Sequence, residues 1–130
     1  MQRRTRVLVA DDHPSVRENL RYIINAESDL ECVGVARDGP QSMKLCRELT
    51  PDVLVLDDEM PGNIEGLEIA RSLSGELRDL RIVMYTLDVD VCDAARTLGA
   101  GCVLKDANYD VLVRAVRNAA ASLPRSAETY

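Results

Sequence analysis

Several polar side chains stand at the ends of short apolar runs that are spread along the whole chain. They are the carboxylates of Asp11, Asp12 and Asp57, the hydroxyl of Thr86 and the ammonium group of Lys105. If the apolar runs are parallel strands of one sheet, their carboxyl ends share an edge, and residues far apart in the sequence meet there. The sequence therefore predicts one site that contains three carboxylates, a hydroxyl and an ammonium group.

The chemistry of such a site follows from its charges. Crowded carboxylates repel one another in a poorly solvated cleft unless a proton or a cation is added. Carboxylate oxygens select Mg²⁺, with Mn²⁺ as a second possibility, and bound Mg²⁺ often contacts phosphate oxygens. Thr86 and Lys105 could then bind phosphoryl oxygens, which leaves Asp57 as the nucleophile that forms an acyl phosphate.

Each of these residues also has an ordinary structural explanation. An Asp-Asp pair after a strand commonly caps a helix, and a single Lys105 or Thr86 is commonly a surface or strand-end residue. His13, beside the acidic pair, is interpreted as a capping or surface histidine without a catalytic role. Only the combination of these residues at matching strand ends favours the functional interpretation.

The elements that must position these residues can be predicted from the apolar pattern. Short apolar runs predict strands at residues 6–10, 30–36, 53–56, 82–85 and 102–104. Apolar residues at helical spacing predict a helix after each strand, the fourth ending at Gly99 and the fifth capped by Asn108. This alternation predicts an α/β fold, a doubly wound five-stranded parallel sheet with helices on both faces. The flavodoxin-like (βα)5 strand order 2-1-3-4-5 suits five strands.

Length and composition limit the possible functions. The 130 residues suit one domain, predicted at residues 1–121, with residues 122–130 as a tail or truncated linker. A net charge of −6 argues against nucleic-acid binding by this domain. No apolar run is long enough to cross a bilayer and the start lacks a signal-peptide pattern, so we expect a cytoplasmic protein without membrane contact.

The remaining composition disfavours other chemistries. Cys32, Cys46, Cys92 and Cys102 stand singly in apolar stretches, which predicts reduced, buried thiols rather than a zinc site or disulfides. The chain has no Trp and no Phe to stack on a flavin, so a flavodoxin-like electron carrier is disfavoured. Glycine-rich nucleotide-binding motifs are also absent from the sequence.

Four stretches, VLVADDHPSVRENL, PDVLVLDDEMPG, IVMYTLD and GAGCVLKDA, resemble the motifs of response regulator receiver domains of bacterial two-component systems. Asp-Asp-His-Pro and Leu-Lys-Asp resemble the NarL/FixJ-like branch, and the similarity covers residues 6–121. The resemblance implies that Asp57 accepts a phosphoryl group from a sensor histidine kinase. It also implies that Asp12 binds the metal directly, that Asp11 assists through water, and that the backbone carbonyl of Glu59 is a further ligand.

The same resemblance implies a signalling phosphoacceptor that catalyses only its own phosphorylation and dephosphorylation. Thr86 and Lys105 would hold the phosphoryl oxygens, and the surface of the fourth helix, fifth strand and fifth helix would change. A homodimer is possible, and DNA binding in transcription regulation would belong to an absent C-terminal helix-turn-helix domain. The turn at Met60-Pro61-Gly62 favours Asp57 over the adjacent Asp58 as the acceptor.

Three positions depart from the family's pattern. Cys102 stands where a Tyr or Phe is common, three residues before the lysine, and the large Leu87 follows Thr86. The loop that begins at Pro61 is one residue longer than the frequent form. These departures keep open an alternative, a phosphorylation-independent, pseudo-receiver-like module that signals by constitutive dimerisation or partner docking.

Overall fold

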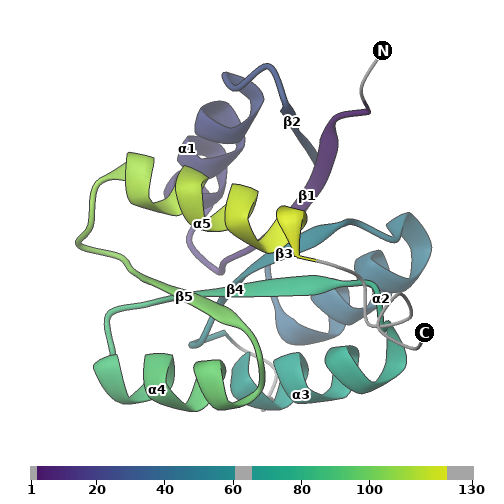
Figure 1. Ribbon diagram of the computed structural model, residues 1–130, viewed down its shortest axis with the longest axis vertical. Coiled ribbons are helices and arrows are strands. Elements are labelled where there is room, and N and C mark those ends of the chain that lie inside the picture. Colours follow the sequence, from purple (N-terminus) through teal and green to yellow (C-terminus); the bar gives the residue numbers. More distant parts are fainter. Residues whose placement is uncertain (1–2, 61–65, 123–130) are drawn as a thin grey trace.

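The computed structural model describes residues 3–60 and 66–122, in which five strands alternate with five helices (Figure 1). The strands are β1 (Thr5–Ala10), β2 (Leu30–Ala36), β3 (Val53–Asp57), β4 (Arg81–Thr86) and β5 (Gly101–Leu104). The helices are α1 (Pro14–Asn25), α2 (Gly39–Leu49), α3 (Gly66–Glu76), α4 (Val89–Thr97) and α5 (Tyr109–Ala121). The predicted long loop from Pro61 and most of the predicted tail lie outside the described residues.

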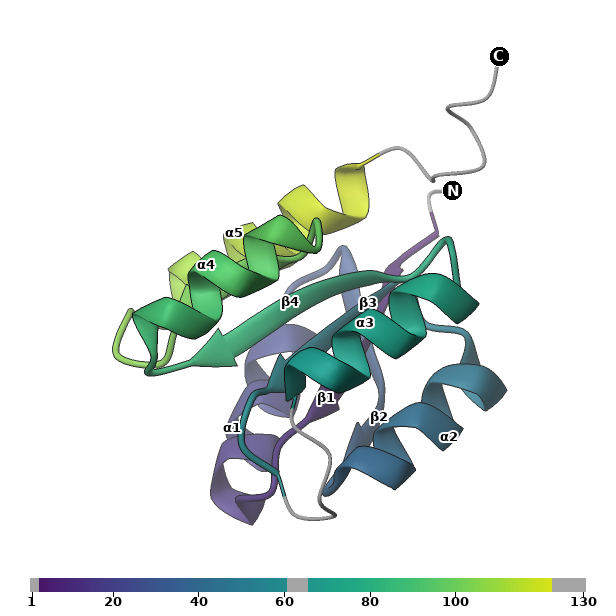
Figure 2. The same cartoon turned by 90° about the horizontal axis from the view of Figure 1, so that it is seen from below.

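The strands form one parallel sheet in the order β2-β1-β3-β4-β5, so the predicted doubly wound, flavodoxin-like fold is confirmed. Helices α1 and α5 cover one face of the sheet, and α2, α3 and α4 cover the other (Figures 1 and 2). Within the described ranges, none of the helices combines the length and the apolar character that crossing a bilayer requires.

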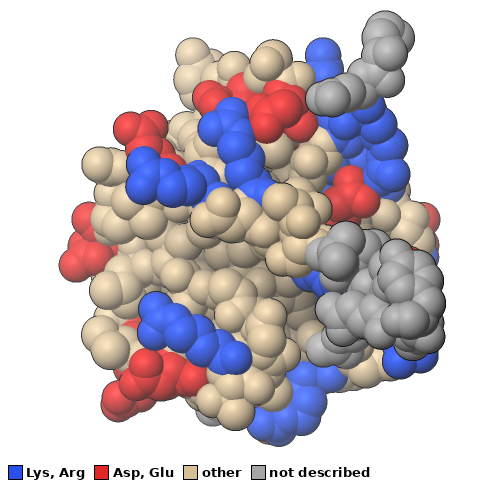
Figure 3. All heavy atoms as spheres, viewed as in Figure 1, with Lys and Arg blue, Asp and Glu red and all other residues tan. Residues whose placement is uncertain are grey.

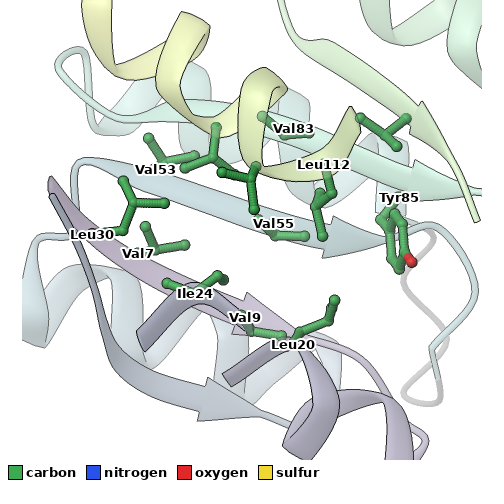
Figure 4. Packing of buried hydrophobic residues seen from close by; sticks show 13 residues of the cluster. Val7, Val9, Leu20, Ile24, Leu30, Val53, Val55, Val83, Tyr85 and Leu112 are labelled. Atoms are coloured by element: carbon green, nitrogen blue, oxygen red, sulfur yellow. The ribbon is translucent and has the colours of Figure 1, made fainter. Parts of the chain in front are cut away.

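The sheet is buried on both faces because its strands are apolar at nearly every position. Alternate residues of a strand point to opposite faces. Val7 and Val55 therefore pack toward α1 and α5 (Figure 4), whereas Leu8 and Leu54 pack toward α2 and α3. All four side chains are buried. This double burial explains why the strands read as continuous apolar runs rather than as an alternating pattern.

Side-chain caps fix where three of the helices begin. Asn108 accepts hydrogen bonds from the amides of Asp110 and Val111 at the start of α5, as predicted. Asp38 caps α2 and Asp88 caps α4 in the same way. Such caps satisfy backbone amides that have no partner inside the helix.

The prediction that all four cysteines are reduced thiols is wrong for one pair. Cys92 in α4 and Cys102 in β5 form a disulfide, with their Cα atoms 5.3 Å apart. A turn at Gly99, whose φ is +82°, returns the chain from α4 onto β5 and brings the two sulfur atoms together. Cys32 and Cys46 are free, and burial raises the pKa of the Cys46 thiol to about 12.

The start of α3 lies directly against the end of β3. The amide of Gly66 donates a hydrogen bond of 3.1 Å to the carbonyl of Asp58. A Cβ atom at Gly66 would lie 2.6 Å from the Cα atom of Asp58 and 2.8 Å from the carbonyl oxygen of Asp57. Because these neighbours are backbone atoms, only glycine permits the observed approach of α3 to the end of β3.

Replacing Gly66 by alanine should therefore force the backbone at Asp57 to shift. We expect Gly66→Ala to lower the free energy of unfolding by about 2 kcal/mol, in the range of overpacking substitutions. Gly75→Ala is the matched control, since Gly75 lies in the same helix, is exposed, and has nothing within 4 Å of an added Cβ. Urea denaturation should show the control to be as stable as the wild type or slightly more stable. Equal stabilities of the two variants would contradict the close approach.

Candidate functional site

The carboxyl ends of four strands converge on one cavity of about 610 Å³. Asp12 follows β1, Asp57 ends β3, Thr86 ends β4 and Lys105 follows β5. The predicted convergence of these residues is present in the structure. The complete lining is Asp12, His13, Asp57, Asp58, Glu59, Thr86, Leu87, Asp88, Val89 and Lys105.

The ammonium group of Lys105 lies between two carboxylates. Its Nζ atom is 3.1 Å from Oδ1 of Asp57 and 3.2 Å from Oδ2 of Asp11. Only 20% of the Lys105 side chain is exposed, and Asp11 and Asp57 are almost completely buried. The aromatic ring of Tyr85 lies below the ammonium group, with its centroid 5.6 Å from Nζ, and adds a favourable cation–π contact.

Burial and charge shift the proton affinities of this pair. Burial raises the pKa of Asp57 to about 6, and the negative charge of Asp11 adds to the rise. The Glu59 amide, which donates to Oδ1 of Asp57 at 3.2 Å, and the charge of Lys105 work in the opposite direction. Burial alone would lower the pKa of Lys105, but attraction to Asp57 and Asp11 outweighs it, so the pKa of Lys105 is raised.

Among the described residues, two buried carboxylate oxygens at this site accept no hydrogen bond: Oδ2 of Asp57, and Oδ1 of Asp12, which lies 2.9 Å from Nδ1 of His13 without hydrogen-bond geometry. Buried polar atoms without a partner are rare in folded proteins and commonly mark a missing ion or water. Ligand atoms of Asp11, Asp12, His13 and Asp57 all lie within 4.8 Å of one another. The residues present therefore fit a small divalent cation, and the carboxylate oxygens suit Mg²⁺ or Mn²⁺.

Thr86 and Glu59 differ in burial and in the groups through which they contact the site. Thr86 is fully buried, and its hydroxyl oxygen accepts a hydrogen bond of 2.9 Å from the amide of Asp88, directly before α4. The site is therefore connected to the start of α4. Glu59 is exposed and lines the cavity, and of its two backbone groups the amide is the one that contacts Asp57.

The adjacent carboxylates of Asp57 and Asp58 differ strongly in their surroundings. Asp57 is only 2% exposed and contacts Lys105, whereas Asp58 is half-buried and lies at the cavity wall. Leu87 also lines the cavity with 70% of its surface exposed. Leu87 therefore lies at the solvent-exposed margin of the cavity rather than in its interior.

His13 is a member of the cluster to which the sequence analysis gave no role. Its Nδ1 atom lies 2.9 Å from Oδ1 of Asp12 and 3.2 Å from Oδ1 of Asp11. The ring is 65% exposed, so it borders the carboxylates from the solvent side. The direct adjacency of His13 to the Asp-Asp pair was the available signal, but adjacency alone does not fix where the ring points.

Comparison with known proteins identifies the family. The response regulator receiver domain matches residues 7–117. The uncharacterized transcriptional regulatory protein YxjL of Bacillus subtilis is 38% identical over 118 residues, which cover 88% of this chain and 54% of that protein. The nitrate/nitrite response regulator protein NarL of Escherichia coli is 35% identical, with the same coverage of both chains. This chain thus spans about half the length of these curated relatives.

A solved structure shows the same architecture. The signal receiver domain of the putative response regulator NarL from Mycobacterium tuberculosis superimposes with a TM-score of 0.85 at 32% identity. The match covers 94% of this chain and 100% of that one. Together with the strand order and the acidic cluster at the strand ends, these matches show that the chain belongs to the response regulator receiver domains of bacterial two-component systems, alongside NarL-type relatives.

Proposed function

We propose that this receiver domain accepts a phosphoryl group on Asp57 from a sensor histidine kinase, in a reaction that depends on Mg²⁺. The observation that carries the proposal is the buried Oδ2 atom of Asp57, which accepts no hydrogen bond from the residues that the structure describes, on a side chain that lines the same cavity as Lys105. An oxygen free of hydrogen bonds keeps its lone pairs available for attack on phosphorus. The product is an acyl phosphate on a side chain that the fold protects from bulk water.

The metal would be held mainly by the carboxylates of Asp12 and Asp57. Asp11 would assist through water, and the backbone carbonyl of Glu59 would complete the protein ligands. When bound, Mg²⁺ or Mn²⁺ supplies positive charge that neutralises the developing negative charge on the transferred group. Oδ1 of Asp12 supports this assignment, because it is buried and accepts no hydrogen bond from the described residues, although Nδ1 of His13 lies 2.9 Å away.

Lys105 and Thr86 would bind the transferred group. The ammonium group of Lys105, now 3.1 Å from Oδ1 of Asp57, is within reach of oxygens attached to that carboxylate. The hydroxyl of Thr86 can donate a hydrogen bond to a phosphoryl oxygen while its own oxygen is held by the Asp88 amide. Both contacts strengthen when the transferred group brings its negative charge into the cavity.

We further propose how this domain is used in a longer protein. In the relatives named transcriptional regulatory protein and response regulator, the matched region makes up only 54% of the protein. DNA contact would belong to a C-terminal domain that follows a linker starting near residue 122, with the receiver spanning residues 1–121. Phosphorylation would change the surface of α4, β5 and α5, and the changed surface would bind a second copy of the chain to form a homodimer.

We place the protein in the cytoplasm, where kinase and phosphodonor are found.

One observation favours a second function. The disulfide between Cys92 and Cys102 joins α4 to β5, the two elements that a phosphorylation switch would move. A permanently tied pair of elements would suit a module that docks partners or dimerises without phosphorylation. The tests below separate the two functions.

Acetyl phosphate with Mg²⁺ should add the mass of one phosphoryl group to the intact protein. Asp57→Asn should abolish the addition, because the amide is a far weaker nucleophile, and a chelator should abolish it in the wild type. Asp58→Asn is the matched control and should still be modified, since Asp58 lacks the contact with Lys105. Intact-mass spectrometry gives the result. An unmodified mass for the wild type would support the phosphorylation-independent module instead.

The raised pKa of Asp57 predicts a pH-dependent stability of the metal-free protein. Because the folded state binds this proton more tightly than the unfolded state, the contribution of Asp57 to stability is complete below about pH 4 and is lost as the pH rises through about 6. Asp57→Asn cannot ionise. The stability of this variant relative to the wild type should therefore increase by about 2–3 kcal/mol between pH 4 and pH 7, since one pKa unit corresponds to ~1.4 kcal/mol.

Urea denaturation of both proteins with a chelator, at intervals from pH 4 to 7.5, measures this difference. Saturating Mg²⁺ should reduce it at pH 7, because the cation supplies the missing counter-charge for the wild-type carboxylate. A difference that stays constant across this pH range would show that Asp57 has an ordinary proton affinity.

A further inference from the structure

The disulfide joins two elements that meet at one side of the molecule. Strand β5 is the edge strand of the sheet, and α4 packs against it (Figure 1). Cys92 in α4 is only 3% exposed, while Cys102 in β5 is half-buried. The face formed by α5, β5 and α4 is largely free of charged side chains in its middle and charged at its margins (Figure 3). The bond therefore fixes the helix to the strand within this face.

Both joined elements lead directly into the acidic cavity. Cys102 precedes Lys105 by three residues, and α4 begins just after Asp88, whose amide holds the hydroxyl of Thr86 at 2.9 Å. The amide of Lys105 also donates a hydrogen bond of 2.8 Å to the carbonyl of Thr86. A bond between α4 and β5 thus restrains the two residues of the cavity that would bind phosphoryl oxygens.

The fold does not need this bond to keep α4 in place. Ala95 is fully buried, and Val91 and Leu98 pack against the same apolar cluster as β4. The two cysteines are only ten positions apart in the sequence, and short loops gain less from a cross-link than long ones. We therefore expect the protein to fold with the two sulfur atoms reduced.

We propose that Cys92 and Cys102 form a reversible dithiol–disulfide site, exchanging with glutathione-type thiols, whose oxidation state sets whether α4 can move relative to β5. The part of this proposal that concerns the movement of α4 rests on the proposed phosphoacceptor function. In the reducing cytoplasm, where we place the protein, disulfides are usually transient and redox-sensing rather than permanent. The other two cysteines are separate from it, since Cys32 lies in β2 and Cys46 in α2.

The chemistry is thiol–disulfide exchange in two steps. The half-buried Cys102, as the thiolate, attacks one sulfur of oxidised glutathione, and a glutathione thiolate leaves. The Cys92 thiolate then attacks Sγ of Cys102 in the mixed disulfide and displaces the second glutathione. Two electrons pass from the protein thiols to the glutathione disulfide, and the two protein protons end on the two glutathione thiols. Reduced glutathione reverses both steps.

The first experiment titrates the wild-type protein in buffers of reduced and oxidised glutathione, traps free thiols with an alkylating agent and maps them by mass spectrometry. Cys92 and Cys102 should become alkylated together, with a midpoint inside the glutathione range, because they react as one pair. Cys32 and Cys46 are internal controls whose labelling should not follow the redox ratio. A pair that stays oxidised at every ratio, or that stays reduced at every ratio, would overturn the proposal.

The second experiment measures hydrogen exchange in α4 with and without Mg²⁺ and beryllofluoride, a phosphoryl mimic, in the oxidised and the reduced protein. In the reduced protein we expect the α4 amide exchange rates to change at least about fivefold, the lower end of common allosteric couplings, and less than about twofold in the oxidised protein. The double variant Cys92→Ser/Cys102→Ser should behave as the reduced protein in both redox buffers. The double variant Cys32→Ser/Cys46→Ser should keep the redox dependence.

Equal responses of α4 in the two redox states would overturn the regulatory half of the proposal. Acetyl phosphate labelling of the same samples separates this failure from a failure of the proposed function. If neither redox state is modified on Asp57, the phosphoacceptor function fails and the regulatory half fails with it. The glutathione titration still decides whether the dithiol site exists, because it does not depend on Asp57.

Discussion

The structure depends on the burial of two carboxylates, Asp11 and Asp57, on either side of the ammonium group of Lys105, with the half-buried Asp12 beside them at the carboxyl ends of the strands. Asp11 and Asp57 are nearly inaccessible to water, so their mutual repulsion is poorly screened, and Lys105 neutralises only one of the negative charges. A divalent cation would bring Asp11, Asp12, Asp57 and Lys105 to neutrality. A phosphoryl group on Asp57 would disturb this balance again, since it replaces one negative charge by about two. Under the proposed function, an added phosphate would therefore draw positive and hydrogen-bonding groups toward the site.

The packing around the site would confine such a response to one side of the cavity. The strands are packed on both faces, which restrains the backbone at Asp57. Gly66 also allows the start of α3 to contact this backbone directly. The side of the cavity formed by Thr86 differs, because the Thr86 hydroxyl is bound to the amide that precedes α4. Any movement of Thr86 toward a bound phosphate must change that contact. In the proposed function, this contact would direct the response toward α4 rather than toward α1 or α3.

The order of the strands and the meeting of the polar residues could be predicted because both follow from short-range patterns. Apolar runs alternating with helical spacing give a parallel sheet, and a parallel sheet brings Asp12, Asp57 and Lys105 to one edge whatever their separation in sequence. The disulfide could not be predicted, because a separation of ten positions between Cys92 and Cys102 does not show that the turn at Gly99 returns α4 onto β5. The contacts of His13 were missed for a similar reason, since they depend on ring orientation and not on spacing.

Cys102 stands where the family commonly has an aromatic residue, and this difference changes how β5, which leads to the cavity, is coupled to α4. The family commonly carries an aromatic ring here, and a ring couples neighbouring elements through packing, which depends on its rotamer and on the space around it. Cys102 cannot fill that space, but it couples β5 to α4 through a covalent bond. Thermal motion repopulates rotamers continuously, whereas a covalent bond opens only when electrons are supplied. Where a ring would respond to the occupancy of the proposed phosphoryl site alone, the proposed redox pair would also make the coupling between α4 and β5 depend on the redox state of the surroundings.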